Sequence, residues 1–235
     1  MTTVKRIVCL ANSKKMSGRC LAGRELSAGG AGQWIRPVSS RPSEEVSEDE
    51  RQYDDGKDPR LLDVIDVPLL QPVPHACQTE NWLLDSSQYW RRIRRANWSE
   101  LQAYVEDPPT LWVNGYSTYH GEHDEIPQAE ADQLPRSLYL IRVTGVDLRV
   151  FAPQEAFGNP KRRVQARFQH GDVKYSLWIT DPDIEREYKA LNDGSYVLGQ
   201  CCLTVSLGEP YRAKGSDYRY ELVAAVIQRP GDSGT

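Results

Sequence analysis

The alternation of apolar and polar residues is most regular in the second half of the chain. Residues 164–169 alternate apolar and polar side chains, and residues 173–180 repeat this alternation beyond a His-Gly-Asp turn. A period of two residues predicts two β-strands that form a hairpin with one apolar face. Residues 138–143 and 148–151, which flank Gly145, are also strand-like.

A short helix is predicted directly after this hairpin. Residues 180–182 (TDP) supply a capping residue and a proline for the first turn, and an Asn-Asp-Gly sequence ends the helix after about residue 191. Further strands are predicted at 200–207 and 218–227. A long strand, a hairpin, a helix and two more strands are the element order of the Greek-key OB barrel.

The first half of the chain has a less regular pattern. It predicts strands at 4–10, 33–38, 64–70, 76–84 and 111–113, and a helix at 98–105 capped by Asn97. This order echoes the second half only loosely, and the two halves share no residue-level repeat. We predict a mostly β protein with two small OB-like (Greek-key) β-barrels, each with a short helix, at 1–135 and 136–230, followed by a short tail at 231–235.

Charge is distributed unevenly along the chain. The net charge is −4, but segment 44–58 holds eight acidic and two basic residues, so the remaining chain carries +2. We expect this segment to be an exposed acidic insertion in the first barrel, and whether it screens basic loops is left open. Basic residues cluster near 14–19, 91–95 and 161–167. Local clusters matter more than net charge for binding phosphates, although a solvated surface is the commoner explanation for any one cluster.

Composition and motifs exclude several classes of function. No segment approaches the roughly 20 apolar residues of a membrane helix, and the start lacks a signal-peptide cleavage site. The five cysteines form no C-x-x-C pair, so we expect a cytoplasmic protein with reduced thiols. The lack of a long apolar segment leads us to expect no membrane partner. The chain has no P-loop, G-x-S-x-G or dinucleotide motif, and His120 and His123 lack the spacing of a helical zinc site. We therefore predict no catalytic residue, metal or cofactor.

Two candidate nucleic-acid contacts lie in the first half. The loop after the first strand offers cationic and hydroxyl donors for phosphate, from Lys14, Lys15, Ser17 and Arg19. Trp34 and Arg36 are two residues apart, which predicts that both lie on one face of a strand. On such a face the aromatic ring can stack on a base while the arginine binds it as a cation. A charged turn and a core tryptophan with a structural arginine are the alternatives.

Two further candidates lie in the second half. A glycine-proline turn carries three cations, Lys161, Arg162 and Arg163. The polar face of the predicted hairpin carries Arg167, Lys174 and Trp178, an aromatic among cations as single-strand binding requires. Packing of Trp178 between the two halves is the alternative. The arginines at 91–95 are a further candidate for nucleic-acid binding. The alternative is that they begin a helix and form ion pairs with the acidic residues of 44–58.

Several segments resemble the bacterial dual-OB-containing family. They are residues 9–23 (CLANSKKMSGRCLAG), 32–39 (GQWIRPVS), 157–163 (FGNPKRR), 180–182 (TDP) and 206–210 (SLGEP). The resemblance spans nearly the whole chain. It implies two OB-like barrels and a role in nucleic-acid recognition within bacterial defence systems, and it brings no catalytic residues.

Three functional hypotheses follow from the sequence. The first is a non-enzymatic module that binds single-stranded DNA or RNA. The second is a protein-interaction or regulatory subunit of a multi-component system, with the acidic segment as a contact. The third is an unrecognised nuclease or base-modifying enzyme that uses the polar loop at 120–124.

Overall fold

The chain folds into two compact units. The computed structural model describes residues 1–27, 30–213 and 215–231. The first unit comprises residues 1–104 and 135–137, and the second comprises residues 105–134 and those from 138 onward. The sequence predicts a single boundary at residue 135. In the structure, residues 105–134 already belong to the second unit, and residues 135–137 return to the first. Beyond Gly231, the predicted tail lies outside the described residues.

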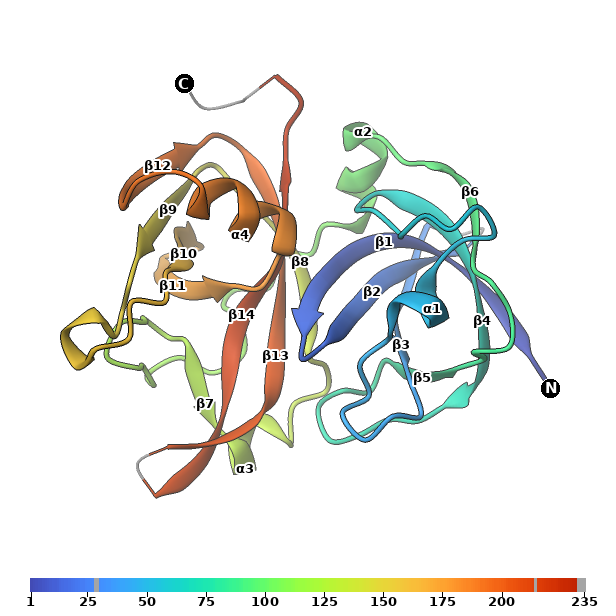
Figure 1. Cartoon of the computed structure of the whole chain (residues 1–235), viewed down its shortest axis with the longest axis horizontal. Coiled ribbons are helices and arrows are strands. Elements are labelled where there is room, and N and C mark those ends of the chain that lie inside the picture. Colours follow the sequence, from blue (N-terminus) through green and yellow to red (C-terminus); the bar gives the residue numbers. More distant parts are fainter. Residues whose placement is uncertain (28–29, 214, 232–235) are drawn as a thin grey trace. The chain divides into compact units, whose positions relative to one another are not determined.

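The first unit is built from strands with two very short helices. Its elements are β1 (Thr3–Lys15), β2 (Gly18–Ser27), β3 (Gly30–Val38), α1 (Glu48–Arg51), β4 (Asp63–Pro72), β5 (Asn81–Leu84), β6 (Arg91–Arg95), α2 (Trp98–Leu101) and the 3-10 turn η1 (Gln102–Tyr104). The order of paired strands is β1-β2-β3-β5-β4, and β4 pairs back onto β1, so five strands close a barrel. Strand β6 adds to one edge of β4 (Figure 1).

The acidic segment provides the helix of this first barrel. Helix α1 lies between β3 and β4, the position of the OB helix between the third and fourth strands. Val46 and Tyr53 belong to the core, and the buried Arg51 donates to Asp58 at 2.9 Å. The prediction of an exposed insertion is therefore wrong for these side chains, because a short barrel helix needs apolar residues beside it.

The second unit contains the longer elements. They are β7 (Glu125–Pro127), α3 (Gln128–Ala131), β8 (Leu138–Val143), β9 (Val146–Phe151), the 3-10 turn η2 (Glu155–Phe157), β10 (Arg163–His170), β11 (Val173–Ile179), α4 (Pro182–Lys189), β12 (Gly194–Leu198), β13 (Cys201–Ala213) and β14 (Ser216–Gln228). Strands β8 and β9 are two halves of one bent strand around Gly145, and β12 and β13 likewise form two halves. Pairing of β12 with β9 and of β13 with β8 closes the second barrel.

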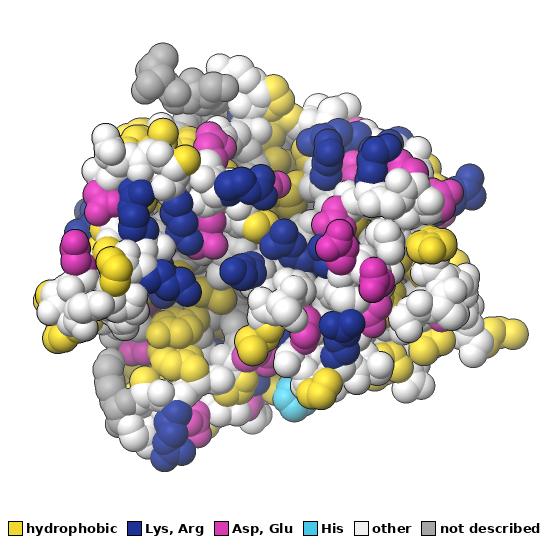
Figure 2. Space-filling view, viewed as in Figure 1, with side chains coloured by type: hydrophobic (Ala, Val, Ile, Leu, Met, Phe, Trp, Pro, Cys, Tyr) yellow, Lys and Arg dark blue, Asp and Glu magenta, His cyan; other side chains and the backbone are white. Residues whose placement is uncertain are grey.

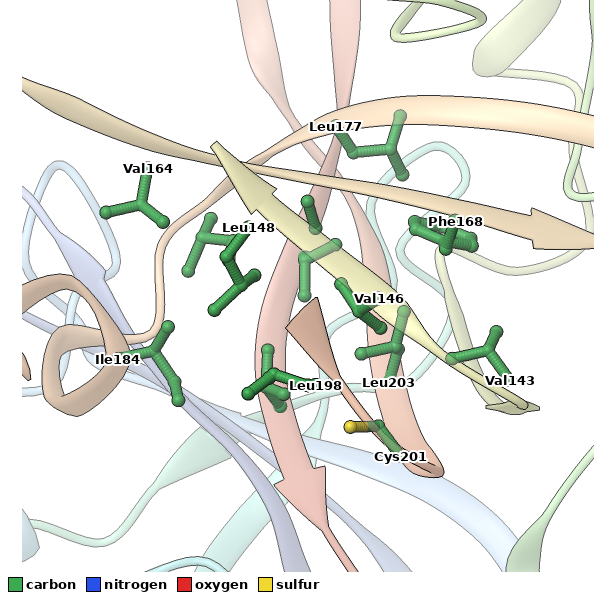
Figure 3. Close-up of a cluster of buried hydrophobic side chains, with 14 of the residues drawn as sticks. Val143, Val146, Leu148, Val164, Phe168, Leu177, Ile184, Leu198, Cys201 and Leu203 are labelled. Atoms are coloured by element: carbon green, nitrogen blue, oxygen red, sulfur yellow. The ribbon is translucent and has the colours of Figure 1, made fainter. Parts of the chain in front are cut away.

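Alternation along the strands fills this second barrel. Val164, Ala166, Tyr175 and Leu177 point into the core, as the sequence pattern predicts. Figure 3 shows Ile184 from α4 in the same cluster, with Leu148 and Leu198. Asp181 caps α4 by accepting from Asp183 N, and Pro182 occupies the first turn. The predicted hairpin, helix and cap are confirmed.

The first half and the linking segment differ from the predictions in detail. Residues 76–80 are a loop before β5, and residues 111–113 form no strand because this segment runs along the second barrel instead of pairing. The predicted helix at 98–105 is one turn of α-helix, α2, followed by η1. Asn97 caps it as expected, by accepting from Glu100 N at 3.0 Å. Among the described residues, no helix is long and apolar enough to cross a membrane.

Candidate nucleic-acid interface

The outer face of the second barrel gathers aromatic and cationic side chains on β9, β10 and β11. The residues that alternate with the core point outward on these strands, and in an OB barrel this side carries the oligonucleotide site. We call this surface the β9–β11 face; it comprises Asp147, Arg149, Phe151, Arg163, Gln165, Arg167, Lys174, Ser176 and Trp178. Strand register places Phe151 opposite Arg163, and Gln165 between Arg149 and Trp178.

Two arginines on this face lie over aromatic rings. The guanidinium of Arg163 is 4.0 Å from the ring centroid of Trp178, and that of Arg149 is 4.1 Å from Phe151. The two rings are themselves neighbours, with centroids 5.7 Å apart. Burial lowers the pKa of Arg163 from its ordinary value, although the group remains a cation at neutral pH. Each ring therefore orients a planar cation that can stack on a nucleobase.

Trp178 itself offers no open ring face. Its side chain is only 4% exposed, because Arg163 covers the ring and the segment before β7 runs along β11. Ser176 and Glu122 exchange two backbone hydrogen bonds, of 3.0 and 3.3 Å, and Gln165 Nε2 donates to His120 O at 2.7 Å. Arg163, and not the ring of Trp178, therefore forms the outer surface at this position.

Exposed groups border the face. Arg167 and Lys174 are exposed, and Arg167 is 3.9 Å from Asp147. Tyr119 is 94% exposed and packs edge-on against His120, which in turn contacts Phe151. These residues form a continuous row of rings from solvent to the strand surface.

The loop between β9 and β10 borders the same barrel and contains a fully displayed aromatic. Phe157 in η2 is 87% exposed, and Lys161 is exposed two residues before β10. Arg162, a predicted phosphate ligand, instead holds the end of α4. It donates to Lys189 O at 2.8 Å and Leu191 O at 2.7 Å, and it pairs with Asp193 at 2.6 Å. A cation at a helix C-terminus satisfies the last carbonyls, so Arg162 has a structural role.

Sequence reasoning missed Arg149, Phe151, His120 and Tyr119. A signal was present for the first two, since Arg149 and Phe151 are two residues apart on a predicted strand, as Trp34 and Arg36 are. No signal marks Tyr119, and His120 is singled out only in the polar loop at 120–124 of the enzyme hypothesis, because this loop reaches the face only through pairing with a distant strand.

In the first unit, the cationic loop after β1 contacts the acidic segment. Arg19 and Val46 exchange two backbone hydrogen bonds of 2.9 Å, and Ser17 Oγ donates to Glu45 at 3.4 Å. Lys14 is exposed, whereas Lys15 and Arg19 are half-buried. The loop therefore leaves Lys14 as its most accessible cation, while Ser17 and Arg19 help to attach the segment of α1.

Trp34 and Arg36 share the outer face of β3, because Ile35 between them points into the core. Arg36 is buried and pairs with Glu80 at 2.9 Å and with Ser137 Oγ at 2.8 Å. Ser137 Oγ also makes a short hydrogen bond to the same Glu80 oxygen. Arg36 is thus committed to the protein interior and does not reach a surface ligand.

A pocket of about 190 Å³ lies beside Trp34. Its walls come from β2, β3, the loop before β5 and the segment at 135–136, and include Arg24, Gln33, Trp34, Thr79, Glu80 and Arg136. Arg24 is opposite Trp34 in the strand register, with its guanidinium 5.6 Å from the ring centroid. The pocket therefore occupies the β2–β3 side, where OB barrels bind their ligands.

The arginines at 91–95 form strand β6 and not a helix start. All five residues of β6 are exposed along one edge of β4, and Arg94 pairs with Glu100 at 2.7 Å. Figure 2 shows Lys and Arg side chains over the α2 and β6 end of the first unit and, separately, around α4 of the second. The first group includes the arginines at 91–95, which the sequence marks as a basic cluster, and their exposure leaves a basic surface on the first unit.

The histidine loop has the contacts of a structural segment. His120 Nε2 is 3.0 Å from Pro153 O, and His123 Nδ1 accepts from Gly115 N at 2.9 Å. Asp124 is buried and accepts from Thr118 N and Oγ1. Within the described part of the chain, no group of three His, Cys, Asp or Glu residues is placed to hold a metal ion.

These features define the class of protein: two Greek-key OB barrels with aromatic and cationic residues on the outer faces of β2–β3 and β9–β11. The model of the dual OB-containing domain family matches residues 5–226, and the chain belongs to this family. A search of functionally curated proteins found no match.

Proposed function

We propose that this protein is a binding module for single-stranded nucleic acid. The observation that carries the proposal is the β9–β11 face, where Arg149 and Arg163 lie on aromatic rings that the exposed Tyr119 reaches through His120. The β9–β10 loop adds the exposed Phe157. Aromatic rings and guanidinium planes stack on unpaired bases of any sequence.

Charge at the border of the face completes the interface. Lys161, Arg167 and Lys174 are exposed cations that can follow a phosphate backbone. A duplex hides its base faces in the helical stack, so it can use these cations but not the rings. Single strands therefore gain binding energy at this surface that a duplex of equal charge does not.

The experiment compares oligonucleotide affinity by fluorescence anisotropy for wild type, Tyr119→Ala and Phe157→Ala. Each lost stacking contact is expected to weaken binding of a single-stranded 15-mer by roughly 1–3 kcal/mol. Tyr89→Ala is the matched control, since Tyr89 is an exposed aromatic, 64% accessible, in the first unit. Both DNA and RNA oligonucleotides are tested.

A salt series separates charge from stacking. Arg167→Ala and Lys174→Ala should each reduce the slope of log K against log salt by about 0.7, the value for one single-strand phosphate contact. Arg186→Ala, which removes an exposed α4 cation paired with Asp183, is the control for general charge loss. Equal affinity for duplex and single strand, or unchanged affinity in both ring variants, would reject the proposal. A protein that binds no oligonucleotide would favour the protein-docking hypothesis.

A further inference from the structure

Strand β6 presents a row of arginines along an uncovered edge of the first unit. Its sequence is Arg-Arg-Ile-Arg-Arg at 91–95, and all five residues are exposed. Within the described part of the chain, the one strand that pairs with β6 is β4. The opposite edge of β6 therefore faces solvent, and Figure 2 shows basic side chains over this end of the unit.

The arginines occupy both faces of β6. Cross-strand neighbours share one face of a sheet. Arg91 is opposite Asp66, whereas Arg92 is opposite the core residue Ile65 on the other face. The guanidinium of Arg92 is 6.0 Å from the ring centroid of Tyr53. Positive charge thus surrounds the edge of the strand and is not confined to one side of the sheet.

The carboxylates beside β6 on strand β4 are held by other groups. Asp66, opposite Arg91, accepts two hydrogen bonds from Arg6, at 2.7 and 2.8 Å. Asp63, opposite Arg95, is buried and accepts two hydrogen bonds from groups outside β6. Neither Arg91 nor Arg95 forms an ion pair with any residue that the structure describes.

Other acidic residues compensate little of this charge. Glu100 pairs with Arg94 at 2.7 Å. In the acidic segment, Asp55 pairs with Lys57 at 2.5 Å, and Arg92 is the smallest of the contributors to its lowered pKa. Among the described residues, three of the four β6 arginines therefore lack an ion pair, in a chain whose net charge is −4.

The composition of this edge favours phosphate over a strand from a protein partner. Charged side chains and bulges on edge strands oppose the addition of another strand. β6 has both, since a register shift leaves Ile93 without a partner on β4. Lysine is the usual protective residue on such edges, yet every charge on β6 is an arginine. The planar fork of arginine matches the oxygens of a phosphate group.

The length of the row also fits a phosphate backbone. Four residue steps along a strand span about 13 Å. One strand of a DNA duplex carries a phosphate about every 3.4 Å of helix axis, so this length corresponds to about four phosphates. The backbone of β6 is already fixed by its pairing with β4, so binding orders the arginine side chains alone.

We propose that β6 binds the phosphate backbone of nucleic acid, in a duplex and in a single strand alike. Contacts to phosphate oxygens position a nucleic acid without reading its bases, so this site has no sequence preference. The inference goes beyond the proposed function. The β9–β11 face gains its stacking contacts from unpaired bases, whereas β6 needs only phosphates and lies in the other unit.

The test uses the full-length protein and a 15-base-pair DNA duplex, with fluorescence anisotropy between 50 and 200 mM salt. Arg91→Ala with Arg95→Ala removes two exposed cations that form no ion pair within the described residues. This pair of substitutions should reduce the slope of log K against log salt by about 1.8, at about 0.9 for each duplex phosphate. The affinity lost over this salt range should then be about twelvefold smaller than in wild type.

Two control variants separate the β6 site from general charge. Arg186→Ala with Arg229→Ala removes two exposed cations from the second unit and should leave the slope unchanged. Arg91→Lys with Arg95→Lys keeps both charges of β6 and should keep the wild-type slope. Melting temperatures should stay close to the wild-type value in every variant, because all four positions are exposed.

Three results would overturn the inference. The first is an unchanged slope in the alanine pair of β6, and the second is an equal loss of slope in the second-unit control. The third comes from a 15-residue polyglutamate peptide. Tighter binding of this peptide than of the duplex, lost in the alanine pair of β6, would assign the edge to an acidic protein partner.

The outcome is distinguishable from a failure of the proposed function. Tyr119→Ala and Phe157→Ala should leave the duplex slope unchanged, because a duplex hides its base faces. If these ring variants weaken single-strand binding but the duplex slope does not depend on β6, only this inference fails. If the duplex slope depends on β6 but the ring variants bind single strands like wild type, the proposed function fails and the β6 site remains.

Discussion

The two barrels share one strand order but bury carboxyl groups in opposite ways. In the first unit, the buried Glu80 lies 2.9 Å from the buried Arg36. In the second, Glu221 is fully buried, and neither carboxyl oxygen has a hydrogen-bond partner among the described residues. Burial, followed by the nearby Asp124, raises the pKa of Glu221 well above its ordinary value. One barrel thus pairs a buried carboxylate with a cation, whereas in the other burial favours the protonated form of a carboxyl group that has no hydrogen-bond partner among the described residues.

The same contrast extends to other carboxyl groups. In the first unit, hydrogen bonds from Ser87 lower the pKa of Asp85, and the hydrogen bond from Arg94 lowers the pKa of Glu100. In the second unit, burial raises the pKa of Asp124 and Asp181. Similar topology therefore does not impose similar electrostatics, because the partners of each carboxyl group come from loops that differ between the barrels.

Breaking the charge pair of the first unit should have the largest effect. Arg36→Ala leaves Glu80 buried beside Ser137 without its cation, and we expect the unfolding free energy of this unit to fall by about 3–5 kcal/mol. The control is Arg186→Ala in the second unit, which removes an exposed ion pair and should cost less than about 0.5 kcal/mol. Urea unfolding followed by hydrogen exchange in each unit measures both. Similar losses in the two variants would contradict the comparison.

Removing the unpartnered carboxyl group of the second unit should raise the unfolding free energy of that unit. Glu221→Met at neutral pH removes a buried polar group that lacks partners, and we expect a gain of roughly 1–3 kcal/mol. The pKa of Glu221 is about 4.3 in the unfolded chain and higher in the folded one, so the folded state binds more protons between these two values. The wild-type second unit should therefore lose stability as pH rises from about 4.3 through the raised pKa of folded Glu221.

The pH series also separates the two units. Lowered carboxyl pKa values in the first unit contribute stability above their unfolded values, and this contribution is lost as pH falls. The first unit should therefore weaken toward acid while the second weakens toward neutral pH. A Glu221→Met protein that keeps the wild-type pH slope in its second unit would show that another group controls the titration.

Helix caps should give the smallest difference between the units. Asp181 accepts from Asp183 N, Ile184 N and Val226 N, so Asp181→Ala should cost about 2 kcal/mol. Ser47 donates from N and Oγ to Glu50 at the start of the shorter α1, and Ser47→Ala should cost only about 0.5 kcal/mol. Thermal unfolding of both variants gives the ratio, and a larger loss for Ser47→Ala would reverse the expected order.

The second barrel was predictable from sequence because its signals are local. The alternation through β10 and β11, the turn at Gly171 and the Asp181-Pro182 cap each act within a few residues. The first barrel depends on a four-residue helix inside an acidic segment and on β2, which no alternation marked. Its helix is defined by tertiary contacts of Val46 and Tyr53, and such contacts leave no periodic pattern.

The candidate site was predictable only where a strand face determines it. Arg167, Lys174 and Trp178 do lie on one outer face, as the alternation of their strands predicts. Arg163, which the sequence assigns to the preceding turn, instead begins β10 and joins the same face. The cover that Arg163 gives Trp178 and the burial of Arg36 could not be derived, since both depend on partners distant in sequence. Glu80 and Ser137, which hold Arg36, are 44 and 101 residues away from it.

The short return of residues 135–137 to the first unit has a consequence for synthesis on the ribosome. These residues follow thirty others that belong to the second unit, yet Ser137 completes the buried contacts of Arg36 and Glu80. A nascent chain that has emerged only as far as residue 104 lacks this closing contact, and its pocket wall is missing as well. The strands that close the first barrel are therefore complete by residue 84, whereas the buried contacts of Arg36 are completed only after the segment that leads into the second barrel has been made.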